Sequence, residues 1–381
     1  MSFRTLTAPR IFDGSRFHTD TALVLAADGT VEALVPLSKA PGAEVLDGIL
    51  TPGFVNCHCH LELSHMKGQL PEATGLVAFV KGVIGGRAAD PEVIAAAIGA
   101  ADAEMRRNGI MAVGDISNTS DTAATKRQSA LAYCNFVEVL GWAPGSAEGS
   151  YGRALAVVDA FAGCGPAAIV PHASYTVSEA LWERIGPGFA GKVISVHNQE
   201  TPFEDEFMER GTGPFVDMYQ YLGVDNTHHV PTGRSSLRGY FNRLSEAARR
   251  ILVHNTFIPA ADVAYALEQS PADTTFFCLC INANLYIERQ VPPVELLRSA
   301  GAPIVLGTDS LASNWSLGIH DELRALRQHF PKVPLEEMLQ WATLNGAKAL
   351  NKEGELGAFG KGKRPGVLLL QEEDLSVARI A

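Results

Sequence analysis

The sequence predicts an α/β protein, a distorted (β/α)8 TIM barrel that carries a small β-sandwich built from both chain ends. Short apolar runs alternate with helix-like segments through the middle of the chain, which is typical of parallel strands joined by helices. There are eight such runs, the number that closes a barrel. Residues 1–50 and 355–381 carry only short strand-like runs with turn signals. We therefore expect these two segments to form the sandwich beside a barrel of residues 51–354.

The candidate barrel strands are the eight apolar runs, at residues 51–60, 110–116, 133–140, 167–172, 192–197, 250–255, 274–280 and 302–309. Helix-like segments lie between them, for example 91–109 before the second run and 292–301 before the eighth. The rival arrangement is an open, doubly wound sheet. The chain has no G-x-G-x-x-G loop that would favour such a sheet.

Composition limits the classes of partner. The chain has 42 acidic and 31 basic residues, and this net charge of -11 argues against nucleic acid and membrane surfaces as partners. No apolar run reaches the roughly 20 residues that span a bilayer, and the first residues lack a signal-peptide core, so we expect a cytoplasmic protein. The six cysteines include no C-x-x-C pair and are expected to be thiols. A homodimer is compatible with the sequence.

Two histidines end the first predicted strand. His58 and His60 are two residues apart, so on a strand their imidazoles project from the same face. At the end of a barrel strand that face looks into the mouth, which suits two neighbouring metal ligands. Cys57 and Cys59 point the opposite way, toward the helix layer, and are excluded as ligands. A pair of structural histidines is the alternative interpretation.

Polar residues also end three later runs. His197 closes the fifth run and Glu200 follows it, His254 closes the sixth, and Asp309 closes the eighth. Each residue alone is compatible with a structural role. Together they all lie at carboxyl ends of predicted strands, where the active sites of barrel enzymes form. An acid after an apolar strand is costly to bury unless it is paired or binds a metal.

Four segments of the chain then show a family resemblance. TPGFVNCHCHLELS, ISVHNQE, LVHNT and LGTDSLASN resemble the metal motifs of the amidohydrolase superfamily between Thr51 and Asn314. They are most similar to the mononuclear branch with the cytosine, guanine, adenosylhomocysteine and aminofutalosine deaminases and the triazine hydrolases. The order of H-x-H, His-x-x-Glu and a terminal Asp makes the signal specific, whereas no one of these motifs is specific alone.

The resemblance implies a role for each motif residue. One divalent transition metal, Zn²⁺ or else Fe²⁺, is expected to be bound by four side chains: His58, His60, His197 and Asp309. Glu200 corresponds to the proton shuttle, His254 to the residue that orients the hydrolytic water, and Asp309 also to a proton acceptor. Binuclear relatives place a carboxylated lysine on the fourth strand. That run here is AAIVPHASY, which offers His172 and no lysine.

Five residues are candidate substrate contacts: Glu62, His172, Arg234, Asn282 and Asn284. Glu62 could bind ribose hydroxyls or an amine, or it could form a salt bridge. Arg234 offers a planar donor fork for an anionic group, unless its loop is only solvated. The two asparagine amides could bind a heterocycle edge. His172 is expected to contact the substrate, and a packed strand-end histidine is its alternative.

The predicted function is hydrolytic deamination of a small aminated heterocycle. An activated water would attack a ring carbon that carries an NH2 group, with a purine nucleoside of the aminofutalosine type favoured. The main alternative is hydrolysis of a cyclic amide or of a chlorinated heterocycle at the same metal site. A barrel that binds a ligand without catalysis is the third hypothesis, and the complete set of motif residues argues against it.

Overall fold

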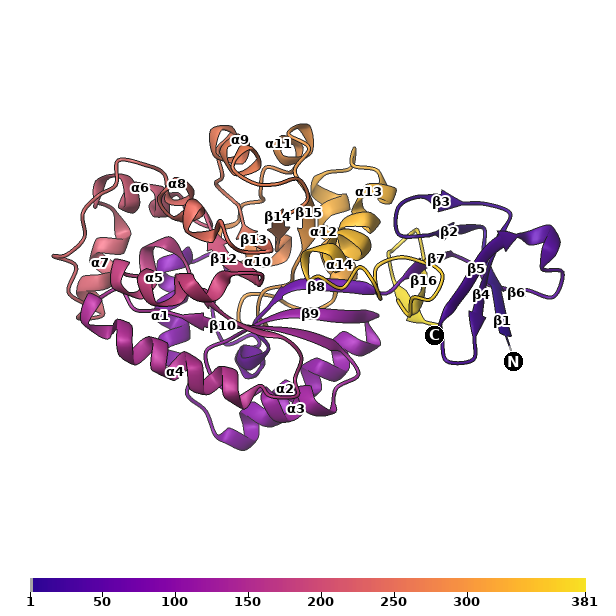
Figure 1. Cartoon of the computed structure of the whole chain (residues 1–381), viewed down its shortest axis with the longest axis horizontal. Coiled ribbons are helices and arrows are strands. Elements are labelled where there is room, and N and C mark those ends of the chain that lie inside the picture. The colour runs from indigo at the N-terminus through magenta and orange to yellow at the C-terminus, as the bar shows by residue number, and fades with distance from the viewer. Residues whose placement is uncertain (1–2) are drawn as a thin grey trace.

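The computed structural model describes residues 3–381, which form a barrel with a smaller all-β part at one end (Figure 1). Both chain ends lie in the all-β part, and the middle of the chain forms the barrel. The predicted fold class, an α/β barrel with a β-sandwich built from both ends, is confirmed. The residue boundaries given above for the two domains stay a prediction.

The barrel strands form two parallel sheets of four strands each. The order in the first sheet is β11 (Ala167–Pro171), β10 (Ala132–Val139), β9 (Ile110–Ser117) and β8 (Phe54–Cys59). The order in the second sheet is β12 (Val193–Asn198), β13 (Arg249–His254), β14 (Thr275–Leu279) and β15 (Ile304–Leu306). Isolated parallel bridges, Cys59 with Asp309 and Ala173 with His197, connect the sheets at both seams. All eight predicted runs therefore contain barrel strands.

The first predicted strand, 51–60, is wrong in its first residues. Thr51 and Pro52 belong to β7 (Ile49–Pro52), which pairs within the sandwich, and the barrel strand β8 begins only at Phe54. Gly53 separates the two strands at a very close approach, since a Cβ there would lie 2.2 Å from the Met111 side chain. The apolar run is therefore continuous in sequence but is divided between two parts of the fold.

Helices cover the outside of the barrel and extend over its mouth: α1 (Leu76–Gly86), α2 (Pro91–Arg107), α3 (Ala123–Gln128), α4 (Ala147–Ala160), α5 (Glu179–Ile185), α6 (Pro202–Arg210), α7 (Pro214–Tyr221), α8 (Ser236–Tyr240), α9 (Ala260–Glu268), α10 (Ile281–Glu288), α11 (Val294–Ser299), α12 (Ile319–His329), α13 (Leu335–Gln340) and α14 (Gly346–Ala349). Helix α2 begins at Asp90, whose side chain accepts from the backbone N–H of Glu92, with Pro91 in the first turn. Among the described helices, none combines the length and apolar character needed to cross a membrane.

The all-β part consists of two sheets. One has the order β5 (Val31–Pro36), β4 (Thr21–Ala26), β1 (Phe3–Thr7) and β6 (Glu44–Val45). The other has the order β17 (Val377–Arg379), β16 (Val367–Leu370), β7, β2 (Arg10–Phe12) and β3 (Phe17–His18). Because β16 pairs antiparallel with β7, the end of the chain is tied to the segment that enters the barrel. Leu6, Leu23 and Val367 are buried together between the sheets.

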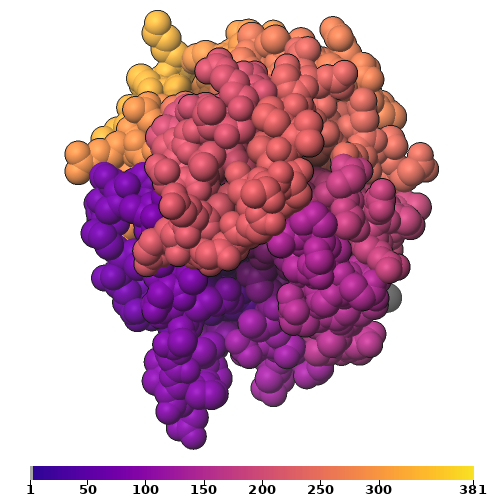
Figure 2. All heavy atoms as spheres, turned by 90° about the vertical axis from the view of Figure 1, so that its left-hand side faces the viewer, coloured from indigo at the N-terminus to yellow at the C-terminus, as the bar shows by residue number. Residues whose placement is uncertain are grey.

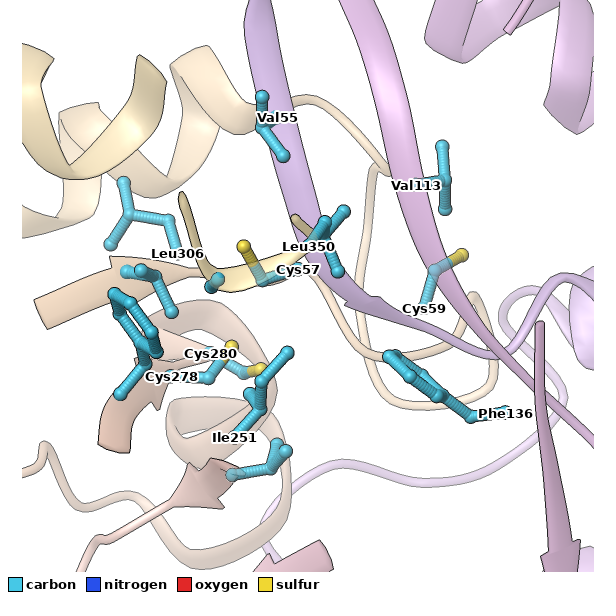
Figure 3. Packing of buried hydrophobic residues seen from close by; sticks show 14 of the residues in the cluster. Val55, Cys57, Cys59, Val113, Phe136, Ile251, Cys278, Cys280, Leu306 and Leu350 are labelled. Carbon is cyan, nitrogen blue, oxygen red and sulfur yellow. The ribbon is translucent and has the colours of Figure 1, made fainter. Parts of the chain in front are cut away.

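The barrel core lies beneath the mouth and is apolar. Figure 3 shows Cys57, Cys278 and Cys280 among its packed side chains, all of them fully buried. The Cys57 thiol lies 3.7 Å from the backbone oxygen of Gly346 in α14, so it faces the helix layer and not the mouth. The six cysteines are free thiols in the structure. This packing gives the strand ends a rigid base.

One buried ion pair supports the segment that follows His60. Asp115 at the end of β9 pairs with Lys126 of α3 at 2.6 Å, and both side chains are fully buried. The other oxygen of Asp115 accepts from the backbone N–H of Leu61 at 2.8 Å, at the start of a 3-10 helix (Leu61–Met66). A buried carboxylate that loses its only cationic partner is strongly destabilising. The pair therefore fixes where the chain leaves β8.

We expect the substitution Lys126→Met to lower the free energy of unfolding by about 3–5 kcal/mol, because Asp115 would stay buried without its cation. The control Arg184→Met breaks an exposed pair with Glu148, whose side chains are 57% and 74% exposed. It should cost at most about 1 kcal/mol. Urea denaturation of both variants measures the difference, and equal losses would contradict this account.

Candidate active site

The polar strand ends meet at the mouth of the barrel. His58 and His60 come from the end of β8, His197 from β12 and His254 from β13, and Asp309 follows β15. Figure 2 looks onto the side of the molecule where α1, α4 and α7 lie and shows a hollow between the purple, magenta and rose segments. The residues are far apart in the chain, and the parallel strands bring them together because all carboxyl ends point to one rim.

Four side-chain atoms converge on one point. The Nε2 atom of His60 lies 3.2 Å from Nε2 of His58 and 3.3 Å from Nε2 of His197. The Oδ1 atom of Asp309 lies 3.5 Å from Nε2 of His58 and 3.4 Å from Nε2 of His60. Donors about 2.0–2.1 Å from a tetrahedral ion are separated by about 3.3 Å, so this spacing fits one divalent cation.

The protonation states also fit a cation. Burial lowers the pKa of His60 to about 3, and it lowers the pKa of His58 and His197 below the ordinary value. Burial alone would raise the pKa of Asp309, but the hydrogen bond and charge of His58 and the charges of His60 and His254 hold it low. Imidazole nitrogens and a carboxylate at this spacing form a donor set that suits a divalent cation.

Backbone hydrogen bonds hold Asp309 next to His58. The N–H groups of Thr308 and Asp309 both donate to the backbone oxygen of His58, at 2.9 and 3.0 Å. Gly307 permits this approach, since a Cβ there would lie 2.8 Å from Cβ of His58. Asp309 and His254 have φ values of 59° and 71°, in the left-handed region that non-glycine residues avoid. Strained backbone is thus held at two of the strand ends.

A second layer of contacts orients the metal-site side chains. The Ser313 hydroxyl donates to Oδ2 of Asp309 at 2.5 Å. Nδ1 of His197 lies 3.0 Å from the backbone oxygen of His172 and 3.3 Å from a carboxylate oxygen of Glu138. These partners leave Nε2 of His197 free to face the cluster.

Glu200 and His254 face each other beside the cluster. Oε1 of Glu200 lies 3.6 Å from Nε2 of His254, and both side chains are buried. Burial raises the pKa of Glu200 well above its ordinary value, with further contributions from Asp309 and Glu288. The backbone N–H of Glu200 donates to Glu204 at 3.3 Å. A raised pKa suits a carboxyl group that donates a proton at this position.

A cavity of about 480 Å³ opens above these groups. Six of the predicted site residues line it: His60, His172, His197, Glu200, His254 and Asp309. Much of its wall is apolar and comes from α1, α7 and the segment after β10, including Leu76, Phe79, Val83, Trp142, Met218 and Tyr219. The further polar residues of the lining include two arginines, an amide and a carboxyl group: Arg87, Arg153, Asn118 and Glu138.

Of the five predicted substrate contacts, the structure brings His172 to the cavity lining and the other four elsewhere. Arg234 is exposed on its loop and does not line the cavity. Glu62 lies behind the wall, because the 3-10 helix after β8 turns it toward Arg87, with which it forms a salt bridge at 2.9 Å. The salt-bridge alternative given above for Glu62 is thus the one that the structure supports.

The two asparagines of α10 lie outside the cavity and serve the structure of the rim. Oδ1 of Asn284 lies 2.9 Å from Nδ1 of His254, so this amide orients the histidine that was expected to hold water. Asn282 donates to the buried Glu322 with its backbone N–H at 3.1 Å and its side chain at 3.0 Å. A helix begins immediately after β14, and it directs both amides into the protein.

Sequence reasoning missed the other polar residues of the cavity. Glu138 carries a signal, since it is a lone acid in the apolar run 133–140, and burial raises its pKa to about 8. Asn118 lies directly after β9, where a strand-end polar residue could have been noted. Arg87 and Arg153 belong to helical segments and carry no such signal, because only tertiary packing brings them to the mouth.

Known proteins with similar sequences and folds include several deaminases. Over 88% of the chain, it is 27% identical to an aminodeoxyfutalosine deaminase of Nitratiruptor sp., and the match covers 83% of that protein. The structure superimposes on the crystal structure of Helicobacter pylori aminofutalosine deaminase in complex with methylthio-coformycin with a TM-score of 0.80 at 22% identity, covering 97% of this chain and 92% of that one.

The same fold occurs in atrazine chlorohydrolase TrzN from Arthrobacter aurescens complexed with zinc. Its TM-score is 0.74 at 18% identity, with 98% of this chain and 88% of that one covered. The sequence profile of the amidohydrolase family matches residues 49–376, which include the strands of the barrel and every residue of the metal cluster. The chain therefore belongs to the amidohydrolase family, as the H-x-H, His-x-x-Glu and terminal Asp motifs indicated.

Proposed function

We propose that this protein is a metal-dependent deaminase that acts on a purine nucleoside-like substrate. It would hydrolyse the bond between a ring carbon and the amino group. The observation that carries the proposal is the meeting of a complete metal-ligand cluster with Glu200 and His254 at the floor of one cavity. The deaminase names of the relatives support the reaction, and the size of the cavity, about 480 Å³, suits a nucleoside better than a free base.

The donor set favours one Zn²⁺, which would be held by His58, His60, His197 and Asp309. Three imidazoles and one carboxylate are ligands that zinc accepts, and Fe²⁺ is the alternative. When bound, such an ion supplies the Lewis acidity that makes water a nucleophile near neutral pH. Two protein residues, His254 and Asp309, lie where they can orient that water and accept its proton.

Glu200 is proposed to transfer protons to and from the substrate. In the proposed reaction its carboxyl gives a proton to the ring nitrogen beside the reacting carbon, and water oxygen bonds to that carbon. The carbon–nitrogen bond to the amino group then breaks, and the leaving nitrogen takes up the proton removed from water, so that ammonia departs. The remaining proton on the oxygen returns to Glu200 as the carbonyl forms, which restores the carboxyl group. Charge that develops at the carbon is balanced by His254. Burial of Glu200 suits this role because it raises the pKa of the carboxyl well above its ordinary value.

The outer cavity favours a substrate with an extended substituent. Beyond the metal cluster the wall is apolar, and Arg153 lies in the lining with no carboxylate partner among the described residues. Its one side-chain partner is the hydroxyl of Ser150, at 3.0 Å. An apolar moiety that ends in an anion would match this wall and this guanidinium. An aminofutalosine-type nucleoside has that character, so we place it first among the substrates to test.

The deciding experiment is a screen for ammonia release by the zinc-loaded protein. The panel contains purine nucleosides, aminofutalosine-type nucleosides, aminopyrimidines and pterins, with a lactam and a chlorotriazine as representatives of the competing reactions. We expect ammonia from a purine nucleoside. Opening of the lactam or release of chloride, without ammonia from any member of the panel, would replace the deaminase proposal by the corresponding hydrolase.

We expect removal of the metal with a chelator to abolish activity and to lower the melting temperature, because three buried imidazoles and Asp309 would lose the charge that holds them together. Added zinc should restore both properties. Activity assays and thermal unfolding before and after dialysis measure the effect. A chelated protein that retains full turnover would contradict the assignment of the cluster.

We expect Glu200→Gln to reduce kcat by at least about 100-fold while zinc content stays the same, because the amide cannot donate and recover the proton. The control is Glu209→Gln in α6, the same change at a residue that does not line the cavity. Turnover and metal content are measured for both variants. Normal turnover of the Glu200 variant would remove this residue from the mechanism.

Glu204, which accepts a hydrogen bond from the backbone N–H of Glu200, predicts that the free energy of unfolding depends on pH. Burial raises the pKa of Glu204 from 4.5 to about 8, so the folded chain keeps a proton that the unfolded chain releases. The stability that this proton confers is present below pH 4.5 and is lost as pH rises through about 8, at about 1.4 kcal/mol per pKa unit.

We therefore expect Glu204→Gln, which keeps the shape and cannot titrate, to lose less stability between pH 5 and pH 8 than the unaltered chain. Urea denaturation of both zinc-loaded proteins across this range measures the difference. Both proteins carry the same metal site, so its own pH dependence cancels in the comparison. Parallel stability curves would show that Glu204 does not hold the extra proton.

A further inference from the structure

One side of the cavity is organised by a carboxylate that does not line it. Glu62 is buried, and its Oε1 accepts from Nη2 of Arg87 at 2.9 Å. Its Oε2 accepts from the backbone N–H of Asn118 at 3.0 Å and from Thr119. Glu62 therefore holds Arg87 and Asn118 next to each other, although one directly follows α1 and the other directly follows β9.

Arg87 offers unused donors to the cavity. Its side chain is 37% exposed, whereas that of Glu62 is 2% exposed. Its backbone oxygen lies 3.0 Å from Nε2 of His65, so the 3-10 helix after β8 fixes both ends of this residue. Within residues 3–381, Glu62 is the single acceptor for the guanidinium. The remaining N–H groups are thus available to a ligand.

Asn118 offers an acceptor beside these donors. Its Nδ2 donates to the backbone oxygen of Glu138 at 3.2 Å and to Oε2 of Glu138 at 3.1 Å. Both acceptors lie on the same side, so they determine which way the amide is turned. The Oδ1 atom then faces away from Glu138, and no described donor binds it. Asn118 lines the cavity with this oxygen unsatisfied by the protein.

The charge of this pair distinguishes it from Arg153. The positive charge of Arg87 is compensated by the buried Glu62, so the pair presents donors and an acceptor without net charge. Such a surface favours a neutral group that both donates and accepts, and a hydroxyl group does both. A full anion would gain less here than at Arg153, which has no carboxylate partner among the described residues.

We propose that Arg87 and Asn118 form a specificity-determining subsite that binds hydroxyl groups of the substrate, as on the sugar of a ribonucleoside. A hydroxyl donates to Oδ1 of Asn118 and accepts from the guanidinium of Arg87, and Glu62 and Glu138 position the two residues. The inference rests on the proposed function only in taking this cavity as the substrate site. It adds that the substrate carries free sugar hydroxyls.

The test measures binding without turnover. Isothermal titration calorimetry on the zinc-loaded Glu200→Gln protein compares adenosine with 2′,3′-dideoxyadenosine, two ligands that differ only in the sugar hydroxyls. We expect adenosine to bind about 10- to 100-fold more tightly, which is the usual effect of a hydrogen bond to a charged group. Adding Arg87→Met should reduce this ratio to about 3-fold or less. Adding Arg153→Met, a matched change at the other cavity arginine, should preserve the ratio.

Asn118→Leu is the second variant, because it removes the acceptor and leaves the ion pair of Arg87 with Glu62 intact, and it decides the question if the Arg87 variant does not fold. Equal affinity for the two nucleosides, no binding of either, or a ratio that survives both Arg87→Met and Asn118→Leu would overturn the inference. Ammonia release by the unaltered protein is scored separately. The proposed deaminase activity can therefore fail while the hydroxyl subsite stands, and the reverse result is equally recognisable.

Discussion

The arrangement of the barrel mouth depends on one buried cluster of polar side chains, formed by three histidines and Asp309. Nε2 of His60 lies 3.2 to 3.3 Å from Nε2 of His58 and of His197, and Oδ1 of Asp309 lies 3.4 to 3.5 Å from His60 and His58. Burial lowers the pKa of the three imidazoles, so it disfavours their charged forms. The left-handed backbone at Asp309 and His254 costs further free energy of about 1–3 kcal/mol each. The closely packed core beneath, in which Gly307 leaves room for His58, holds this arrangement in place.

Buried carboxyl groups also position the residues on the polar side of the cavity. Glu62, Glu138 and Asp115 are buried acids that do not belong to the metal cluster, and each one holds a segment at the rim. Asp115 fixes Leu61 at the exit from β8, and Glu62 and Glu138 orient Asn118. The residues that face the ligand are thus positioned by carboxylates one layer behind them, which limits their motion.

The sequence predicts the strands and the convergence of the strand-end residues well for a physical reason. Apolar runs of buried parallel strands are local signals, and polar residues directly after them must lie at one rim. The run 51–60 fails at its start because β7 and β8 are both apolar, and only the fold shows that Gly53 divides them. The substrate contacts depend instead on side-chain direction in short helices. Glu62 and Asn284 turn inward there, while Arg87 reaches the cavity from a distant helix.

Residues at strand ends and residues of the covering segments would also have different functions in the site. The groups that would move protons lie at strand ends, whose direction is set by the hydrogen-bonded sheet, so their geometry follows from the barrel. The wall that would select the substrate is made by α1, α7 and the ends of β9 and β10, which pack over the mouth and bind to it through side chains. Changes in these covering segments can alter the outer cavity without moving His58 or Asp309. Arg87, Asn118 and Arg153 are therefore more informative about the substrate of this chain than the metal ligands are.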